Sequence, residues 1–119
     1  MKKTVIIGAS TDPSRYAYKA ANSLVRHGHE IIPLGIRAGN VAGKDIILDK
    51  PDLKDIDTVT LYVGPQNQPG WVDYIINLKP KRILFNPGTE NQILMDKARE
   101  NNIEVVEGCT LVMLSIGTY

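Results

Sequence analysis

Short apolar runs alternate with amphipathic segments along this chain. The apolar runs lie at residues 4–8, 30–34, 58–63, 82–86 and 103–106, and between most of them apolar residues recur at helical spacing. This alternation predicts a parallel sheet whose strands are joined by helices. The runs at 5–7 and 83–85 are apolar without a break, as expected of strands covered on both faces. We therefore expect an α/β fold of three layers: a doubly wound, mostly parallel, five-stranded sheet between helices.

Turn and capping residues mark the ends of the first two predicted helices. Pro13 suits a first helical position after Thr11 or Asp12 as cap, and Gly28 suits a left-handed stop, which predicts a helix over residues 13–27. The apolar spacing predicts a second helix over residues 68–78.

Three further elements are predicted in the rest of the chain. Thr89 and Gln92 have the spacing of a capping box, which predicts a third helix that buries Ile93 and the apolar residues on its face. The segment 111–116 is apolar nearly all round, so we expect a short helix buried against the sheet or against another subunit. A short edge strand is predicted at 45–48 within an irregular, charged stretch.

Length, charge and cysteine content restrict the class of protein. The 119 residues predict one domain over 1–119. With 14 Lys and Arg against 13 Asp and Glu the net charge is +1, so we expect neither a nucleic acid nor a membrane as partner. A single cysteine, Cys109, excludes an internal disulfide, and the first residues lack the apolar core of a signal peptide, so a cytoplasmic location is expected.

The predicted sheet places one group of residues at a common edge. In an open parallel sheet the ligand crevice lies beyond the carboxyl ends of the strands. The candidate binding residues at that edge are Gly8, Ala9, Ser10, Arg15, Tyr16, Leu34, Gly35, Ile36, Arg37, Val63, Gly64, Asn86, Pro87 and Gly88. Only Gly8 matches the three glycines of the G-x-G-x-x-G fingerprint, because Ser10 and Pro13 occupy the other two positions, so this motif alone is weak evidence.

The charged residues at this edge indicate a phosphorylated ligand. Arg15 opens the first helix and Arg37 follows the second strand, so both could flank a pyrophosphate. An NAD site usually has an acid after the second strand, whereas residues 33–37 contain none. A phosphorylated ribose fits better, either the 2′-phosphate of NADP or the 3′-phosphate of coenzyme A. Tyr16 could stack on an adenine.

Catalytic and metal-binding patterns are weak by comparison. His27 and His29 are separated by a helix-ending glycine and have no further ligand at metal spacing, so they are interpreted as helix-end residues and no metal is predicted. Ser10 and Ser14 lack the partners of a nucleophile relay. Cys109 is expected to behave as a small buried hydrophobe. These patterns therefore favour a ligand-binding protein over an enzyme.

Several short segments resemble a known family. Residues 8–10, 13–16, 27–30, 57–59 and 107–109 are similar to the small stand-alone CoA-binding domain proteins, whose domain also opens the α subunit of succinyl-CoA synthetase. The resemblance covers nearly the whole chain and implies a Rossmann-like fold with coenzyme A or an acyl-CoA as ligand. It also implies phosphate contacts at Gly8, Ala9, Ser10 and Arg15, and adenosine contacts at residues 34–37. It implies no reaction.

Three hypotheses remain open from the sequence. The first is a CoA-binding module, supported by the paired arginines, the missing acid and the resemblance. The second is an NADP-binding, oxidoreductase-like domain, for which one domain leaves no room for a separate substrate domain. The third is an interaction module with a vestigial nucleotide pocket, in which residues 111–116 dock a partner. A homodimer is compatible with all three.

Overall fold

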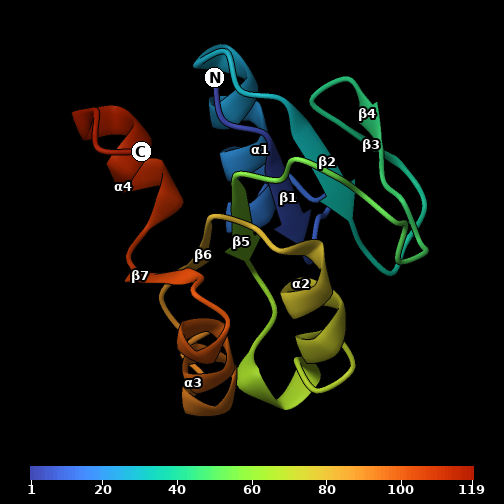
Figure 1. The fold of residues 1–119 in the computed structure, drawn as a ribbon. Coiled ribbons are helices and arrows are strands. Elements are labelled where there is room, and N and C mark those ends of the chain that lie inside the picture. Colours follow the sequence, from blue (N-terminus) through green and yellow to red (C-terminus); the bar gives the residue numbers. More distant parts are fainter.

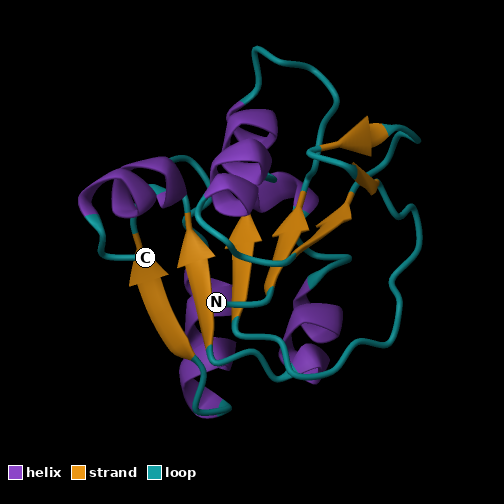
Figure 2. Ribbon diagram, turned by 90° about the horizontal axis from the view of Figure 1, so that it is seen from above, coloured by secondary structure: helices purple, strands orange, loops and turns teal.

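A five-stranded parallel sheet forms the centre of the molecule. The computed structural model describes residues 1–119, and its strands lie side by side in the order β2-β1-β5-β6-β7, all pointing the same way (Figures 1 and 2). The strands are β1 (Thr4–Ile7), β2 (Ile31–Leu34), β5 (Thr58–Leu61), β6 (Arg82–Phe85) and β7 (Glu104–Glu107). The five strands predicted for the sheet are confirmed within a residue or two at their ends, and so is the parallel sheet.

Two pairs of helices cover the two faces of the sheet. The helices are α1 (Tyr16–Arg26), α2 (Val72–Leu78), α3 (Gln92–Glu100) and α4 (Thr110–Ile116). Strand residues such as Val5 and Ile83 pack with α2 and α3, whereas their neighbours Ile6 and Leu84 pack with α1 and α4. The three-layer, doubly wound, Rossmann-like architecture (Figure 2) is therefore confirmed. One apolar cluster lies on each side of the sheet.

Buried threonines line the face of the sheet that α1 and α4 cover. Thr4, Thr58 and Thr60 are fully buried, and a buried hydroxyl needs a hydrogen-bond partner. Thr4 Oγ1 lies 2.5 Å from the Tyr119 hydroxyl, and Arg82 Nε donates to Thr58 Oγ1 at 2.8 Å. These pairs explain how β5, whose sequence alternates polar and apolar residues, is buried on both faces.

The first helix begins later than the sequence predicts. It starts at Tyr16 and not at Pro13, because Asp12 organises a separate turn. The Asp12 carboxylate accepts from the Ser14 backbone N–H at 3.0 Å and from its hydroxyl at 2.8 Å, and the Arg15 N–H donates to the Asp12 carbonyl. The predicted stop is confirmed, since Gly28 has φ +82°.

The predicted starts of the second and third helices are wrong. Residues before α2 form a short 3₁₀ turn, η1 (Pro65–Asn67), and Gln68 follows it outside the helix with a buried side chain. Asn91, not Thr89, caps α3 by accepting from the Ile93 N–H at 3.0 Å. The cap therefore lies two residues later than predicted, and Ile93 is 67% exposed instead of buried.

The irregular stretch and the chain end also differ in detail from the prediction. In place of a strand at 45–48, β3 (Asn40–Val41) and β4 (Lys44–Asp45) form a small hairpin, and Ile47 makes a parallel bridge to Leu34 beside β2. The helix predicted at 111–116 is confirmed as α4, which packs against α1. It buries Leu114, whereas Val112 is 52% exposed. None of the helices combines the length and apolar character needed to cross a membrane.

The two edge strands of the sheet, β2 and β7, differ in what lies beside them. The β2 edge is continued by the Ile47 bridge. The opposite edge is β7, whose central residues are half-buried and whose end residues, Glu104 and Glu107, are exposed.

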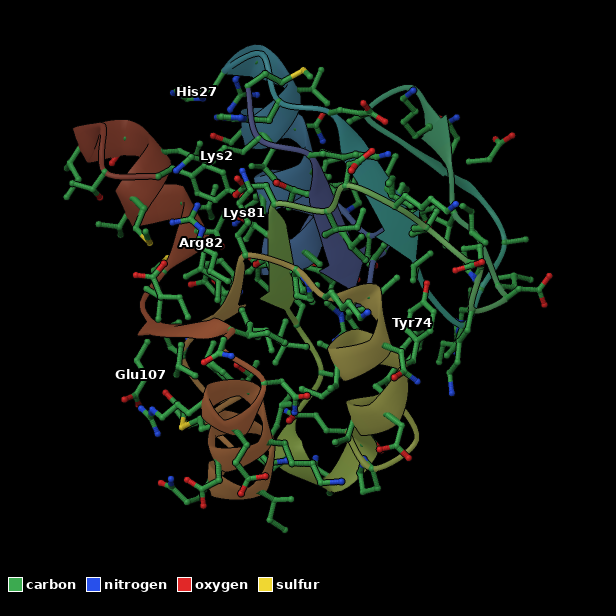
Figure 3. All side chains as sticks on the ribbon, viewed as in Figure 1. Lys2, His27, Tyr74, Lys81, Arg82 and Glu107 are labelled. Atoms are coloured by element: carbon green, nitrogen blue, oxygen red, sulfur yellow. The ribbon has the colours of Figure 1, made fainter.

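A cluster around Tyr119 closes the amino edge of the sheet. The backbone carbonyl of Tyr119 accepts from Lys2 Nζ at 2.5 Å and from Arg82 at 3.0 Å, and the Arg82 guanidinium lies 4.4 Å from the centre of the Tyr119 ring. Figure 3 shows Lys2 and Arg82 on this side of the molecule. The His29 ring packs against the same tyrosine at 4.9 Å, and its Nδ1 accepts from the Lys2 N–H at 2.9 Å. His29 is therefore held in a neutral form.

Acidification is expected to destabilise the fold through His29. Burial, followed by the surrounding positive charges, lowers the pKa of His29 below its ordinary value of 6.5. At pH values between the lowered pKa of the folded state and the ordinary pKa of the unfolded state, the unfolded chain binds more protons than the folded one. The stability that neutral His29 contributes is therefore complete above the unfolded-state pKa and is lost as the pH falls toward the folded-state pKa. Urea unfolding at a series of pH values between about 7.5 and about 5 measures this loss.

His29→Asn is the informative variant, because the Asn carboxamide oxygen accepts from the Lys2 N–H and does not titrate. We expect its free energy of unfolding to fall less on acidification than that of the wild type. His27→Asn, at the exposed end of α1, shows how much of the slope comes from the neighbouring imidazole, whose charge also lowers the pKa of His29. Equal pH slopes for the wild type and His29→Asn would contradict the assignment.

Candidate functional site

The candidate site lies where the connections of the sheet change direction. After β1 the chain crosses to β2 on one side, and after β5 it crosses to β6 on the other, so the switch point lies between the carboxyl ends of β1 and β5. The register keeps these ends level, since Ile7 pairs with both Leu34 and Leu61. The loops that follow the strands are the first loop (residues 8–15), the second (35–39), the third (62–67) and the fourth (86–91). All the candidate binding residues lie in or next to these loops.

Glycines bring the first three loops into contact. A Cβ at Gly8, whose φ is +93°, would lie 3.0 Å from Val63 Cγ1 and 3.1 Å from the Tyr62 carbonyl carbon. A Cβ at Gly35 would lie 2.8 Å from the Ala9 carbonyl oxygen. The structure therefore brings Gly8, Ala9, Gly35 and Val63 together at the switch point. The sequence predicted only that these residues lie at the same edge of the sheet.

Some backbone amides of the first loop are engaged and others are open. The N–H groups of Gly8 and Ala9 both donate to the Leu34 carbonyl, at 3.0 and 2.9 Å. The N–H groups of Ser10 and Thr11 have no acceptor in the protein. The N–H groups in the first turn of α1 also have no acceptor in the protein, because the cap residue Arg15 makes no side-chain capping bond. The open donors thus begin two residues beyond Gly8.

Charged and aromatic side chains surround these open donors. Arg15 is exposed, with its Nε 3.9 Å from the Asp12 carboxylate. Hydrogen bonds from Ser14, first from its backbone N–H and then from its hydroxyl, lower the pKa of Asp12. Lys19 Nζ lies 5.3 Å from the centre of the Tyr16 ring, and Tyr16 is 67% exposed. The start of α1 therefore presents two cations, one carboxylate and an accessible aromatic face.

The residues after β2 are divided between the core and solvent. Leu34 and Gly35 are buried, whereas Ile36 and Arg37 are exposed, Ile36 by 88%. No acid lies among these residues. An apolar side chain and a guanidinium are thus available next to the first loop.

The fourth loop is anchored by a buried carboxamide. Asn86 Nδ2 donates to Thr60 Oγ1 at 2.7 Å and to the Leu61 carbonyl at 2.8 Å, and its Oδ1 accepts from the Thr110 N–H at 2.9 Å. The side chain of Asn86 is therefore used entirely inside the protein. Pro87 and Gly88 are exposed, and Gly88 has φ +91°.

Sequence reasoning missed Gln68, whose side chain is fully buried between two loops. Its Nε2 donates to the Val63 carbonyl at 3.0 Å and to the Thr89 carbonyl at 2.7 Å. Its Oε1 accepts from Asn91 Nδ2 at 2.9 Å. A glutamine predicted to begin a helix gives no signal for this role, because the bonds join segments that are distant in the sequence.

Tyr62 and Cys109 lie beneath this edge. The Tyr62 hydroxyl is buried and has no hydrogen-bond partner, since the nearby hydroxyls of Thr110 and Thr60 are bonded to each other and to Asn86. Burial is the main cause that raises the pKa of Tyr62 to about 12, so the phenol stays protonated. Cys109 is partly and not fully buried, at the cap position of α4.

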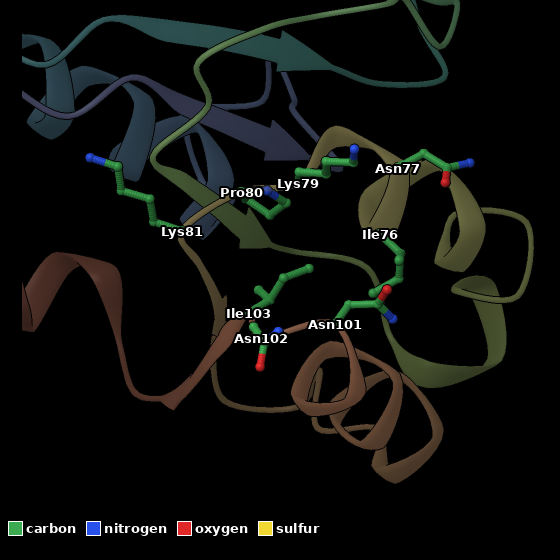
Figure 4. Close-up of a pocket in the computed structure, with 8 residues that line it drawn as sticks. All are labelled: Ile76, Asn77, Lys79, Pro80, Lys81, Asn101, Asn102 and Ile103. Carbon is green, nitrogen blue, oxygen red and sulfur yellow. The ribbon is translucent and has the colours of Figure 1, made fainter.

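The protein also has a hollow away from this edge. It measures about 380 Å³ and lies where α2 and α3 end, next to the amino ends of β6 and β7 (Figure 4). Its polar lining consists of Asn77, Lys79, Lys81, Asn101 and Asn102. None of the predicted binding residues lines it. No group of His, Cys, Asp or Glu side chains is arranged to hold a metal ion.

The sequence matches the family described as CoA binding domain over residues 2–115. No curated protein matches the chain.

Three solved structures illustrate its structural relatives. An uncharacterized protein is 57% identical, with a TM-score of 0.98 over 100% of this chain and 98% of the other. The cell-free ID.343 protein of Thermus thermophilus is 20% identical, with a TM-score of 0.86 over 99% and 90% of the two chains. The dinucleotide forming acetyl-coenzyme A synthetase 1 of Ca. Korarchaeum cryptofilum, in complex with phosphate and ADP, is 19% identical, with a TM-score of 0.67 over 87% and 25%. The last two show the fold alone.

Gly35→Ala is expected to destabilise the protein by about 1–3 kcal/mol, because the new methyl group would overlap the Ala9 carbonyl oxygen of the first loop. Gly70→Ala is the matched control, since its Cβ would meet only Lys50 Nζ at 3.8 Å. At that position we expect no loss, or a gain of about 0.4–1 kcal/mol. Urea unfolding of both variants measures the difference. Equal stabilities would show that the first and second loops are not in close contact.

Proposed function

This chain belongs to the CoA binding domain family, and from that membership we propose that it binds coenzyme A or an acyl-CoA at the carboxyl edge of its sheet. The observation that carries the proposal is the uncapped start of α1 next to the switch point. Open N–H groups there face no acceptor in the protein, and Arg15 and Lys19 stand beside them. A helix N-terminus with free amides and nearby cations favours an anionic group such as a pyrophosphate.

The first loop would hold the phosphates. In this role Gly8 and Ala9 shape the loop, since their own N–H groups are bonded to Leu34 and the Cβ side of Gly8 faces Val63. Ser10 and the first turn of α1 supply N–H donors, and Arg15 supplies a guanidinium. The negative charge of Asp12 would repel an anion, but the carboxylate is held in the turn by Ser14 and its charge is neutralised in part by Arg15.

The second loop would hold the adenosine. Leu34 and Gly35 form its base, Ile36 offers an exposed apolar surface for the adenine, and Tyr16 offers an aromatic face. Arg37 would meet the 3′-phosphate of the ribose, which agrees with the lack of an acid after β2. Val63 and Gly64 in the third loop, with Asn86, Pro87 and Gly88 in the fourth, would border the rest of the ligand.

The occurrence of the same fold within an acetyl-coenzyme A synthetase supports a CoA ligand. This chain covers only 25% of that protein, so the synthetase reaction is not part of the proposal. The alternative ligand is NADP, whose 2′-phosphate would use the same Arg37.

Coenzyme A is expected to raise the melting temperature more than dephospho-CoA, because only the former carries the 3′-phosphate. At about one hundred times its dissociation constant, a ligand that binds only the folded state adds roughly 2.7 kcal/mol of stability. Thermal unfolding with CoA, acetyl-CoA, dephospho-CoA and NADPH measures the order. A shift with NADPH alone would transfer the proposal to NADP, and no shift with any of them would contradict both.

Two arginine variants separate the phosphate contacts. Arg15→Gln is expected to weaken CoA and dephospho-CoA alike, by about tenfold for one charge-assisted bond. Arg37→Gln is expected to weaken CoA by a similar factor and to leave dephospho-CoA unchanged. Arg99→Gln on α3, which is exposed and far from these loops in the fold, is the control. Isothermal titration calorimetry measures the dissociation constants, and unchanged values for both variants would contradict the placement of the phosphates.

A further inference from the structure

Gln68 joins two of the loops that border the proposed ligand. The third loop follows β5 and the fourth follows β6, and these strands are neighbours in the sheet. The carboxamide of Gln68 reaches both loops, since Nε2 donates to Val63 in the third and to Thr89 in the fourth. No other side chain bonds to the backbone of both loops. Asn86 bonds to the Leu61 carbonyl, which precedes the third loop, and Thr89 bonds within the fourth loop.

Every polar atom of the Gln68 carboxamide makes a hydrogen bond. Both N–H groups of its carboxamide are used, and its oxygen accepts from Asn91 Nδ2. Asn91 in turn accepts from the Ile93 N–H and so caps α3. The bonds therefore run from the third loop through Gln68 to the fourth loop and the start of a helix. An apolar residue at position 68 would leave two carbonyls and one amide group without partners.

Burial indicates that this carboxamide acts on the loops and not on a ligand directly. The Gln68 side chain is 0% exposed, whereas Pro65 and Gln66 before it and Pro87 and Gly88 in the fourth loop are at the surface. Asn86 already ties the bases of the two loops, through its bond to the Leu61 carbonyl. Gln68 fixes their outer parts, where the candidate residues Val63, Gly64 and Gly88 lie.

From this geometry we infer that Gln68 is a positioning residue for ligand binding, which holds the third and fourth loops at the separation that CoA or an acyl-CoA requires. The inference rests on the proposed function. A site whose loops are fixed before binding loses less conformational freedom when the ligand arrives. If the loops separate, only a fraction of molecules is competent to bind, and the apparent affinity falls by that fraction.

Gln68→Met and Gln68→Glu test the role, with Gln92→Met and Gln92→Glu as matched changes at an exposed glutamine. We expect both Gln68 variants to bind CoA at least about tenfold more weakly by calorimetry at neutral pH, at a temperature where circular dichroism shows them folded. The Gln92 variants are expected to bind like the wild type. A purely structural role would lower the melting temperature and leave the dissociation constant of the folded protein unchanged.

The pH profile of Gln68→Glu gives a second readout. When ionised, its carboxylate faces the Val63 and Thr89 carbonyls and offers no donor, whereas protonation restores one O–H donor. Because burial raises the pKa of such a carboxyl, the profile is measured from about pH 9 downward. Its CoA affinity is therefore expected to recover in part as the pH falls, relative to that of Gln92→Glu at each pH. A constant ratio between the two variants would overturn the role of the donor bonds.

A milder variant covers the case in which Gln68→Met does not fold. Asn91→Ser keeps a good helix cap with its hydroxyl and removes the donor to Gln68 Oε1. We expect a loss of affinity of about threefold, smaller than that at Gln68, because the two Nε2 bonds remain.

Failure of the inference and failure of the proposed function give different results. If the wild type binds neither CoA nor acetyl-CoA, the proposed function fails and Gln68 has no such site to position. If the wild type binds CoA and the folded Gln68 and Asn91 variants bind it equally well, the positioning role is wrong and the proposed function stands.

Discussion

The buried carboxamide of Asn86 is the interaction on which the arrangement of the carboxyl edge depends. It bonds to β5 through Thr60 and Leu61, and it receives the first N–H of α4 from Thr110. An amide placed in the interior of a protein stabilises the fold only if its donors and acceptors are paired, and removal of one partner leaves the others unsatisfied. Asn86 therefore makes the end of β6, the end of β5 and the start of α4 a single unit. The loops above it start from this rigid base.

The late start of α1 determines what this edge can bind. A helix that began at Pro13 would have had Thr11 or Asp12 as its cap, and that side chain would have occupied the free amides of the first turn. Asp12 instead closes a turn with Ser14, and α1 begins at Tyr16 without a side-chain cap. Polar residues that form their own local turn compete with the helix for backbone groups. The result is a helix start with open donors next to Arg15, at the switch point of the sheet.

The strands and their common edge could be predicted because each rests on a pattern local to the sequence. Unbroken apolar runs such as the one through Ile83 identify strands covered on both faces, and the parallel order then places their carboxyl ends together. The helix starts could not be predicted in the same way. Thr89 and Asn91 are both acceptable caps, and the choice depends on where each side chain bonds. Thr89 bonds to the Asn86 carbonyl, and Asn91 is held by the buried Gln68, a contact that local spacing does not reveal. The burial of Thr58 and Gln68 depends likewise on partners distant in the sequence.

The exposed glutamates at the two ends of β7 bear on how this protein behaves among copies of itself. An unpaired edge strand offers free N–H and C=O groups to any other strand, which is a route to aggregation. If two molecules met along β7, the glutamate at each end of this four-residue strand would be brought near the glutamates of the other copy. The repulsion between carboxylates would oppose such pairing and keep this edge open in a crowded solution.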